Sequence, residues 1–198
     1  TIGGTNYTTT VNADNTTFSV TVPAAAVGSL TDGNATASVT GTDNAGNSFT
    51  ANATRAYTVD TTASSTIAIN TIASDDIINA TESGNDLVIS GTVGGDAASG
   101  DTVTVTIGGT NYTTTVNADN TTFSVTVPAA AVGSLTDGNA TASVTGTDNA
   151  GNSFTANATR AYTVDTTASS TIAINTIASD DIINATESGN DLVISGTV

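Results

Sequence analysis

Carboxylates are almost the only side chains in this sequence that could do chemistry. The 198 residues include 18 Asp and Glu but only two Lys and Arg, with no His and no Cys, so the net charge at pH 7 is −16. Without His and Cys, the usual general base, the thiolate nucleophile and the softer metal ligands are missing. Oxygen ligands remain, and oxygens clustered in loops are the ligands that Ca²⁺ prefers.

Three segments gather these carboxylates with other oxygen-bearing side chains. The first is Ser-Asp-Asp-Ile-Ile-Asn at residues 74–79, which is followed by Glu82 and Asp86. The second is the Asp-Asn-Ala-Gly-Asn turn that begins at Asp148, and the third is the linker residue Asp60. We interpret all three as candidate calcium sites. Ordinary turn chemistry and surface solubility are the competing explanations, and none of the segments has the spacing of an EF-hand.

An unchanged internal repeat organises the chain. Thr1–Val93 reappears as Thr106–Val198, an offset of 105 residues, and only Gly94–Val105 occurs once. An enzyme rarely needs two identical units, whereas a spacer does, so the repeat favours a structural role. The best natural break, Val-Asp-Thr-Thr-Ala, predicts three parts: 1–59 is the C-terminal part of a repeat, 60–164 a complete repeat, and 165–198 the N-terminal part of the next. We interpret the chain as a window on a longer periodic array.

Alternation with period two and many β-branched residues predict an all-β fold. Seven short strands joined by Asn, Asp and Gly turns are typical of an immunoglobulin-like β-sandwich, here in tandem repeats of 105 residues. In the complete repeat we predict these strands at residues 66–72, 87–93, 102–107, 111–116, 121–127, 140–145 and 153–164, with a helical turn within 128–135.

Strand parity assigns each carboxylate of the complete repeat to one end of the sandwich, because successive strands run in opposite directions. In a tandem array the two ends meet, and bound Ca²⁺ would relieve the repulsion between carboxylates that have no Lys nearby. Asp96 and Asp101 therefore join the candidate ligands. One end is predicted to collect Asp60, Asp96, Asp101, Asp119 and Asp148, and the other Asp75, Asp76, Glu82, Asp86 and Asp137.

Several short motifs, taken in order, resemble a known family. The motifs Leu-Thr-Asp-Gly at 135–138, Asp-Asn-Ala-Gly-Asn at 148–152 and Tyr-Thr-Val-Asp-Thr-Thr-Ala at 162–168 look like the bacterial immunoglobulin-like repeats of giant surface adhesins. Residues 69–79 with Glu82, running into 87–93, are similar to the start of the extender repeats in RTX adhesins.

The resemblance implies calcium at the linkers, type I secretion to the bacterial cell surface, and a stalk that holds a distal binding domain away from the outer membrane. Ser64 and Ser169 stand where the family usually has Pro, which shifts the task of stiffening the linker to calcium. The resemblance carries ligand roles over to Asp60, Asp165, Asp75, Asp76, Glu82 and Asp148, and to their copies Asp180, Asp181, Glu187 and Asp43.

Together these features favour a structural extender repeat of a bacterial cell-surface adhesin, with calcium ions and neighbouring copies of the repeat as partners. Nucleic acid and anionic membranes are disfavoured because both attract basic side chains, and no apolar run is long enough to insert in a membrane.

The alternative is that the repeat itself binds ice or a glycan, through calcium or through Thr-x-Thr rows at residues 102–106 and 113–115. An enzyme is the least favoured class, because the paired carboxylates lie in a polar loop without an aromatic cleft. Arg55 and Arg160 are expected to pair with a nearby acid or to cover the face of the last strand.

Overall fold

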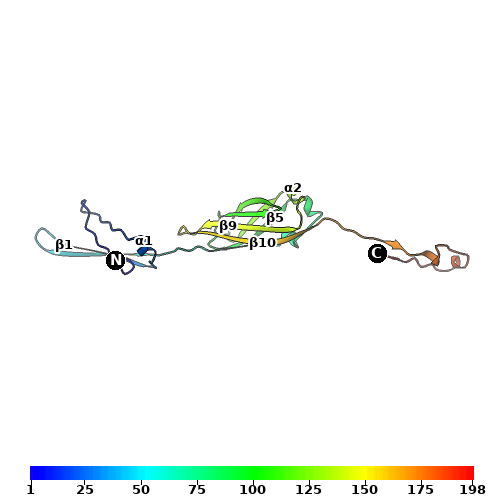
Figure 1. Cartoon of the computed structure of the whole chain (residues 1–198), viewed down its shortest axis with the longest axis horizontal. Coiled ribbons are helices and arrows are strands. Elements are labelled where there is room, and N and C mark those ends of the chain that lie inside the picture. The colour runs from blue at the N-terminus through cyan, green and yellow to red at the C-terminus, as the bar shows by residue number, and fades with distance from the viewer. The chain divides into compact units, whose positions relative to one another are not determined.

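The computed structural model describes all residues from 1 to 198 (Figure 1). The chain divides into two compact units. The larger unit comprises residues 64–148 and 153–198, and the smaller unit comprises residues 1–63 together with the turn 149–152. The domain boundaries that the repeat suggests, at residues 60 and 165, stay predictions.

A β-sandwich of two sheets forms the body of the larger unit. One sheet has the strand order β3-β5-β8, and the other has the order β4-β10-β9-β6-β7. All neighbouring strands are antiparallel except β4 and β10, which are parallel. This confirms the predicted all-β sandwich. The strands are β3 (Ser65–Ile69), β4 (Ile77–Asn79), β5 (Leu87–Gly95), β6 (Thr102–Ile107), β7 (Thr110–Thr115), β8 (Thr122–Val127), β9 (Gly138–Thr147) and β10 (Ser153–Asp165).

All seven predicted strands are present, but the segment after the first one differs from the prediction. Strand β3 ends at Ile69, three residues earlier than predicted, and the extra strand β4 lies in what was predicted as a loop. Between them the 3₁₀ turn η1 (Ile72–Ser74) carries positive φ values of 50° at Ala73 and 71° at Ser74. Because an extended strand cannot contain left-handed residues, the chain turns here and starts a second, short strand.

The core lies between the two sheets, where alternate residues of each strand point inward. Val103 and Val105 of β6 and Val144 of β9 are fully buried, and Phe123 of β8 is only 1 % exposed. The Phe123 ring lies against Gly91 of β5, its register partner, where any Cβ atom would overlap the ring and the Ala68 carbonyl. The glycine therefore makes room for the largest fully buried side chain of the core.

Short helical turns close the connections between the strands. Pro128 precedes the helical turn α2 (Ala129–Val132), which confirms the turn predicted within 128–135, and Val132 is fully buried. Pro suits this position because the first amide groups of a helix have no partner within the helix. A second 3₁₀ turn, η2 (Glu82–Gly84), lies between β4 and β5.

The smaller unit is built around a single hairpin. Strands β1 (Gly33–Thr42) and β2 (Ser48–Tyr57) pair in the same register as β9 and β10, with Gly33 opposite Tyr57 as Gly138 is opposite Tyr162. The helical turn α1 (Ala24–Val27) corresponds to α2. Strands β1 and β2 pair only with each other, and residues 1–63 contain no strand of a second sheet to cover this hairpin.

The C-terminal end of the larger unit also repeats only part of the sandwich. It contains the two-residue strands β11 (Ala173–Ile174) and β12 (Gly196–Thr197), with the 3₁₀ turns η3 (Ile177–Ser179) and η4 (Glu187–Gly189) between them. Strands β11 and β12 pair with each other, as β3 and β5 do in the complete repeat.

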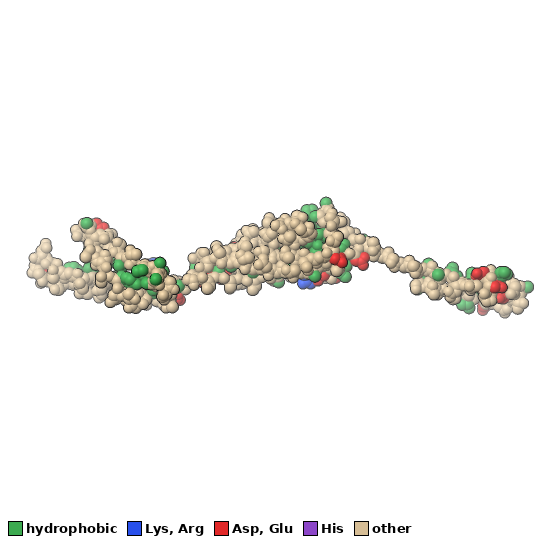
Figure 2. All heavy atoms as spheres, in the orientation of Figure 1, with side chains coloured by type: hydrophobic (Ala, Val, Ile, Leu, Met, Phe, Trp, Pro, Cys, Tyr) green, Lys and Arg blue, Asp and Glu red, His purple; other side chains and the backbone are tan.

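Carboxylates lie at the ends of the strands and in the turns. Figure 2 shows acidic side chains gathered at the end of the sandwich from which the chain leaves toward the C-terminus, while the sides of the sandwich are mostly uncharged. No helix in residues 1–198 is both long enough and apolar enough to cross a membrane.

Candidate functional site

At one end of the sandwich, Asp96 and Asp101 hold the loop between β5 and β6. The Asp96 carboxylate accepts a hydrogen bond of 2.7 Å from the Ser64 amide, so it fixes the point at which the chain enters β3. Asp101 accepts a bond of 2.7 Å from the Ala98 amide, and its other oxygen lies against Gly146 of β9. This end also contains an open hollow of about 440 Å³ between Asp101 and the facing ends of β9 and β10.

The Asp-Asn-Ala-Gly-Asn turns are compact structures in which the aspartate accepts amide hydrogens. In the N-terminal copy, Asp43 accepts hydrogen bonds from the amides of Ala45 and Asn47 at 2.9 and 2.8 Å, and from the Asn47 side chain at 3.0 Å. The Asn47 side-chain bond is the main cause that lowers the pKa of Asp43. Asp148 occupies the same position in the second copy.

The linker residue Asp60 lies next to the second of these turns, within the smaller unit. The side-chain amide of Asn152 donates to the Asp60 carbonyl at 3.1 Å and to its carboxylate at 3.4 Å. The same carboxylate accepts a hydrogen bond of 3.2 Å from the Thr62 amide. Asp60 therefore offers two kinds of oxygen, carbonyl and carboxylate, beside a turn that is rich in Asn and Asp.

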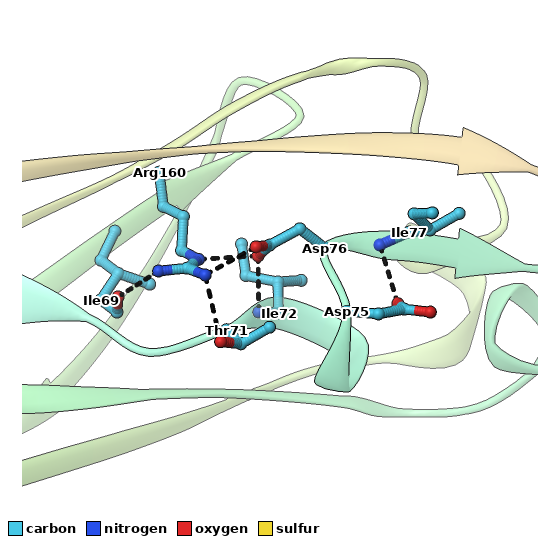
Figure 3. Close-up of polar contacts among 7 residues, drawn as sticks. All are labelled: Ile69, Thr71, Ile72, Asp75, Asp76, Ile77 and Arg160. Atoms are coloured by element: carbon cyan, nitrogen blue, oxygen red, sulfur yellow. Dashed lines mark hydrogen bonds and ion pairs between the residues drawn. The ribbon is translucent and has the colours of Figure 1, made fainter.

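Asp76 forms the one salt bridge of the chain, with Arg160 (Figure 3). The Arg160 Nε and Nη2 atoms donate to the two carboxylate oxygens of Asp76 at 2.7 and 2.6 Å. Nη2 also donates to the Thr71 hydroxyl at 3.0 Å, and Nη1 to the Ile69 carbonyl at 3.4 Å. The Ile72 amide donates a further bond of 2.9 Å to Asp76. This confirms that Arg160 pairs with an acid.

This pairing sets the charge state of both residues. The bidentate bond from Arg160 lowers the pKa of Asp76, and the same contact raises the pKa of Arg160. Since Arg160 and Ile72 already occupy its carboxylate oxygens, Asp76 is the least available of the predicted calcium ligands. The neighbouring Asp75 accepts only one hydrogen bond, of 3.0 Å from the Ile77 amide, and lies exposed.

Glu82 and Asn79 form a capping box at the start of η2. The Asn79 side-chain oxygen accepts hydrogen bonds from the amides of Thr81 and Glu82 at 2.9 and 3.1 Å, and the Glu82 carboxylate accepts one of 3.0 Å from the Asn79 amide. The Asn-x-x-Glu spacing fits this motif, in which two side chains satisfy the free amides of a helix start. One oxygen of Glu82 accepts no bond.

Asp165 ends β10 beside Asn79, its register partner in the parallel strand β4. Its carboxylate accepts one hydrogen bond, of 3.2 Å from the Thr167 amide. The linker and the end of β4 border an open hollow of about 350 Å³, which oxygen-bearing groups line on both sides. The lining residues are Asn79, Ala80, Thr81, Asp165, Thr166, Thr167 and Ala168.

The C-terminal copies of Asp75, Asp76 and Glu82 keep the hydrogen bonds to nearby amides but lack the ion pair with an arginine. Asp180 accepts a hydrogen bond of 3.0 Å from the Ile182 amide, and Asp181 one of 2.8 Å from the Ile177 amide. Glu187 accepts one of 3.1 Å from the Asn184 amide. Unlike Asp76, Asp181 has no ion pair.

The predicted ligands are brought to the strand ends but do not converge on one point. No group of three or more carboxylates in residues 1–198 lies close enough to hold a metal ion. Two carboxylates instead join distant segments: Asp86, from the first candidate segment, accepts from the Ala129 amide at 2.8 Å, and Asp137, which was not a predicted ligand, accepts from the Val164 amide at 2.7 Å. Among these hydrogen-bonded carboxylates, only Glu82 has a recognisable sequence signal, the Asn-x-x-Glu spacing of the capping box.

Several solved structures resemble this chain, and three of them are described below. One is a structure from a study of how a 1.5-MDa bacterial ice-binding adhesin is retained at the host cell surface. It is 43 % identical to this chain, the match covers 99 % of this chain and 62 % of that one, and the TM-score is 0.82. A Ca²⁺-stabilised adhesin that helps an Antarctic bacterium bind ice is 42 % identical over 99 % of this chain and 46 % of that one, with a TM-score of 0.61.

The third structure is a single bacterial immunoglobulin-like domain from the M. primoryensis ice-binding adhesin. It is 43 % identical and is covered completely by 52 % of this chain, with a TM-score of 0.47. No family model and no curated protein matches the chain. From this identity and coverage, the chain belongs to the bacterial immunoglobulin-like domains of large adhesins. It spans less than two thirds of the first two relatives.

Proposed function

We propose that this chain is a structural extender of a bacterial cell-surface adhesin and that Ca²⁺ stiffens its linkers. The observation that carries the proposal is an unchanged 105-residue repeat whose sandwich has carboxylates at both ends, Asp96 and Asp101 at one and Asp75 and Asp76 at the other. Strand β10 alone has 13 residues, which at about 3.3 Å per residue span about 43 Å. Repeats of this kind joined end to end would hold a distal ligand-binding domain far from the cell.

Surface exposure fits both the composition and the relatives. The solved relatives are domains of bacterial adhesins rather than enzymes, and one of them is described as Ca²⁺-stabilised. A chain without Cys needs no disulfide chemistry outside the cell. We further propose secretion by the type I route and folding in external calcium, with neighbouring copies of the repeat as its partners.

Asp165 and the hollow beside it are the best-supported calcium position. Ca²⁺ takes six to eight oxygen ligands, and the residues that line the hollow include Asp165, Asn79 and three Thr, with no His or Cys. Asp75 and Glu82 belong to the same end of the sandwich, and each has an oxygen that accepts no hydrogen bond. Asp60 takes the equivalent position in the first linker, where its carbonyl and carboxylate lie beside Asn152.

Calcium titration by calorimetry tests this position. We expect the full chain to bind Ca²⁺ in preference to Mg²⁺, and Asp165→Asn to lose or weaken one site. Asp119→Asn is the matched control, because the Asp119 carboxylate is already bonded to Thr121 and Thr122 within a turn. If the native chain releases no heat of binding and EDTA leaves its melting temperature unchanged, the calcium proposal fails.

One observation favours ligand binding by the repeat as a second function. The register places Thr102, Thr104 and Thr106 of β6 beside Thr115, Thr113 and Asn111 of β7 on the outward face of the sheet. This makes an uncharged face that carries hydroxyl groups. Thr is also a common outward residue in strands, which explains the same pattern without a ligand. Thermal hysteresis or a glycan-array signal from the full chain would establish the second function, and their absence would leave the stalk alone.

A further inference from the structure

The complete repeat uses its only basic side chain to join the segment that enters the fold to the strand that leaves it. Arg160 is the one Lys or Arg between residues 60 and 164. It lies in β10, from which the chain exits, and its three partners are Ile69, the last residue of β3, and Thr71 and Asp76, which lie between β3 and β4. These contacts link residues that are 84 to 91 positions apart in the sequence.

The same two segments are also joined by backbone pairing. Strand β4 runs parallel to the end of β10, with Ile77 opposite Thr163 and Asn79 opposite Asp165. The Thr163 amide donates a hydrogen bond of 2.9 Å to the Asp76 carbonyl. Asp76 therefore contacts β10 through its backbone and its side chain at once.

Parallel pairing of these strands determines how the repeat responds to tension. A pull on the two ends of the repeat acts first on β3, which precedes β4 and pairs with β5, and then draws β4 backward and β10 forward along a common axis. The bonds between them are then loaded together in shear, whereas strands pulled apart from one end would lose their bonds one at a time. The bidentate Arg160–Asp76 bond lies on the same line of force, and charge-assisted bidentate bonds are among the strongest polar contacts.

The loop that Arg160 holds is also strained and anchored in the core. Ala73, Ser74 and Asp76 have positive φ values of 50°, 71° and 65°, a conformation that is uncommon outside Gly. Ile72 and Ile78, on either side of this stretch, are 1 % and 0 % exposed. The Arg160 guanidinium thus joins β10 to a segment whose two flanking residues are buried. A force on β10 would therefore be transmitted through this segment into the core.

We propose that Arg160, Asp76 and the β4–β10 ladder form a clamp that bears tension between the entering and leaving segments of each repeat. The clamp rests on the proposed stalk function, since a stalk that tethers a cell experiences a pull along its length. It gives the single Arg of the repeat a mechanical role that is separate from calcium.

Single-molecule force spectroscopy tests the clamp on the full chain, held at its two termini under constant force. We expect Arg160→Gln to shorten the lifetime of the folded repeat about tenfold, the factor that follows from losing a hydrogen-bonded contact to a charged group. Arg55→Gln is the matched control, because Arg55 has the same neighbours in sequence but no ion pair. Its lifetime should equal that of the native chain.

A second pulling direction separates a clamp from general stability. Because the chain has no Cys, handles attached through Ala118→Cys and Thr136→Cys would load β8 and α2 without loading β4 or β10. In that direction Arg160→Gln should leave the lifetime unchanged. Equal shortening in both directions, or no shortening when the termini are pulled, would overturn the proposal.

Two further arms keep the result unambiguous. If Arg160→Gln does not fold, Arg160→Lys keeps the charge but loses the bidentate geometry, and it should also shorten the lifetime. Repeating the measurement in EDTA distinguishes the clamp from the calcium proposal, because the clamp predicts the same ratio of lifetimes with and without Ca²⁺. A chain that binds no calcium would then still show the clamp.

Discussion

The complete repeat and the incomplete copies beside it have the same sequence but bury different side chains. Phe123 is 1 % exposed in the complete repeat, whereas its copy Phe18 is 61 % exposed. Val132 is fully buried, whereas its copy Val27 is 49 % exposed. Toward the C-terminus, Ile78 is fully buried, whereas its copy Ile183 is 54 % exposed.

Local sequence therefore determines the turns and hairpins, and distant strands determine the core. The β1–β2 hairpin keeps the register of β9–β10 although the opposite sheet is missing. The Asp14 turn likewise keeps the hydrogen bonds of its copy Asp119, to the second and third residues that follow. Because the core is buried only where the strands of a whole 105-residue repeat are present, we infer that one whole repeat is the unit that folds cooperatively.

Completing the first repeat should have the largest effect on this comparison. If a copy of residues 60–105 is placed before Thr1, two complete repeats are present and the calorimetric enthalpy of unfolding should about double. One repeat should contribute about 70 kcal/mol near 60 °C, from about 0.7 kcal/mol per residue. An unchanged enthalpy, with Phe18 still accessible to solvent, would show that the missing strands are not what leaves that copy open.

Truncation of the copied phenylalanine should show the difference within one chain. Phe123→Ala removes a fully packed ring and should lower the free energy of unfolding by about 3–5 kcal/mol. Phe18→Ala removes the same side chain from an exposed position and should change it by less than about 0.5 kcal/mol. Urea denaturation followed by circular dichroism measures both variants, and equal losses would contradict the burial difference.

The two arginines should differ in their effect on equilibrium stability. Arg160→Gln should lower the melting temperature by about 5 °C, a shift typical of losing one contact in a domain of this size. Arg55→Gln should leave it unchanged, because Arg55 has no acidic partner in this chain. Differential scanning calorimetry distinguishes the two, and a similar shift in both variants would mean that charge alone, rather than the pair, is responsible.

Acid should weaken the complete repeat through Asp76. Its pKa is lowered in the folded state by Arg160, so the stability it contributes is present above the unfolded pKa of about 3.9 and is lost as the pH falls through the lowered value. Melting temperatures between pH 5 and pH 2 should therefore fall more steeply for the native chain than for Asp76→Asn. The Asp181 carboxylate has no arginine partner, so Asp181→Asn should follow the pH profile of the native chain. A flatter pH profile for Asp181→Asn would argue against the Arg160–Asp76 pair as the cause.

Much of the fold could be predicted because strands leave a period-two pattern, and all seven predicted strands are present. Strand β4 could not be predicted, because Ile77–Asn79 has only three residues and directly follows two aspartates that suggest a loop. The placement of carboxylates at strand ends followed from strand direction. The partner of Arg160 did not, because Asp76 lies 84 residues away and ten acids of the repeat were equally plausible.

Small-angle X-ray scattering tests the central claim, that calcium stiffens linkers between repeats, most directly. The chain completed with residues 60–105 before Thr1 would be measured in Ca²⁺ and in EDTA, with Mg²⁺ as the control for ionic strength. We predict a longer maximum dimension and a narrower distribution of distances in Ca²⁺ than in EDTA or Mg²⁺. Profiles that coincide in all three conditions would contradict the account.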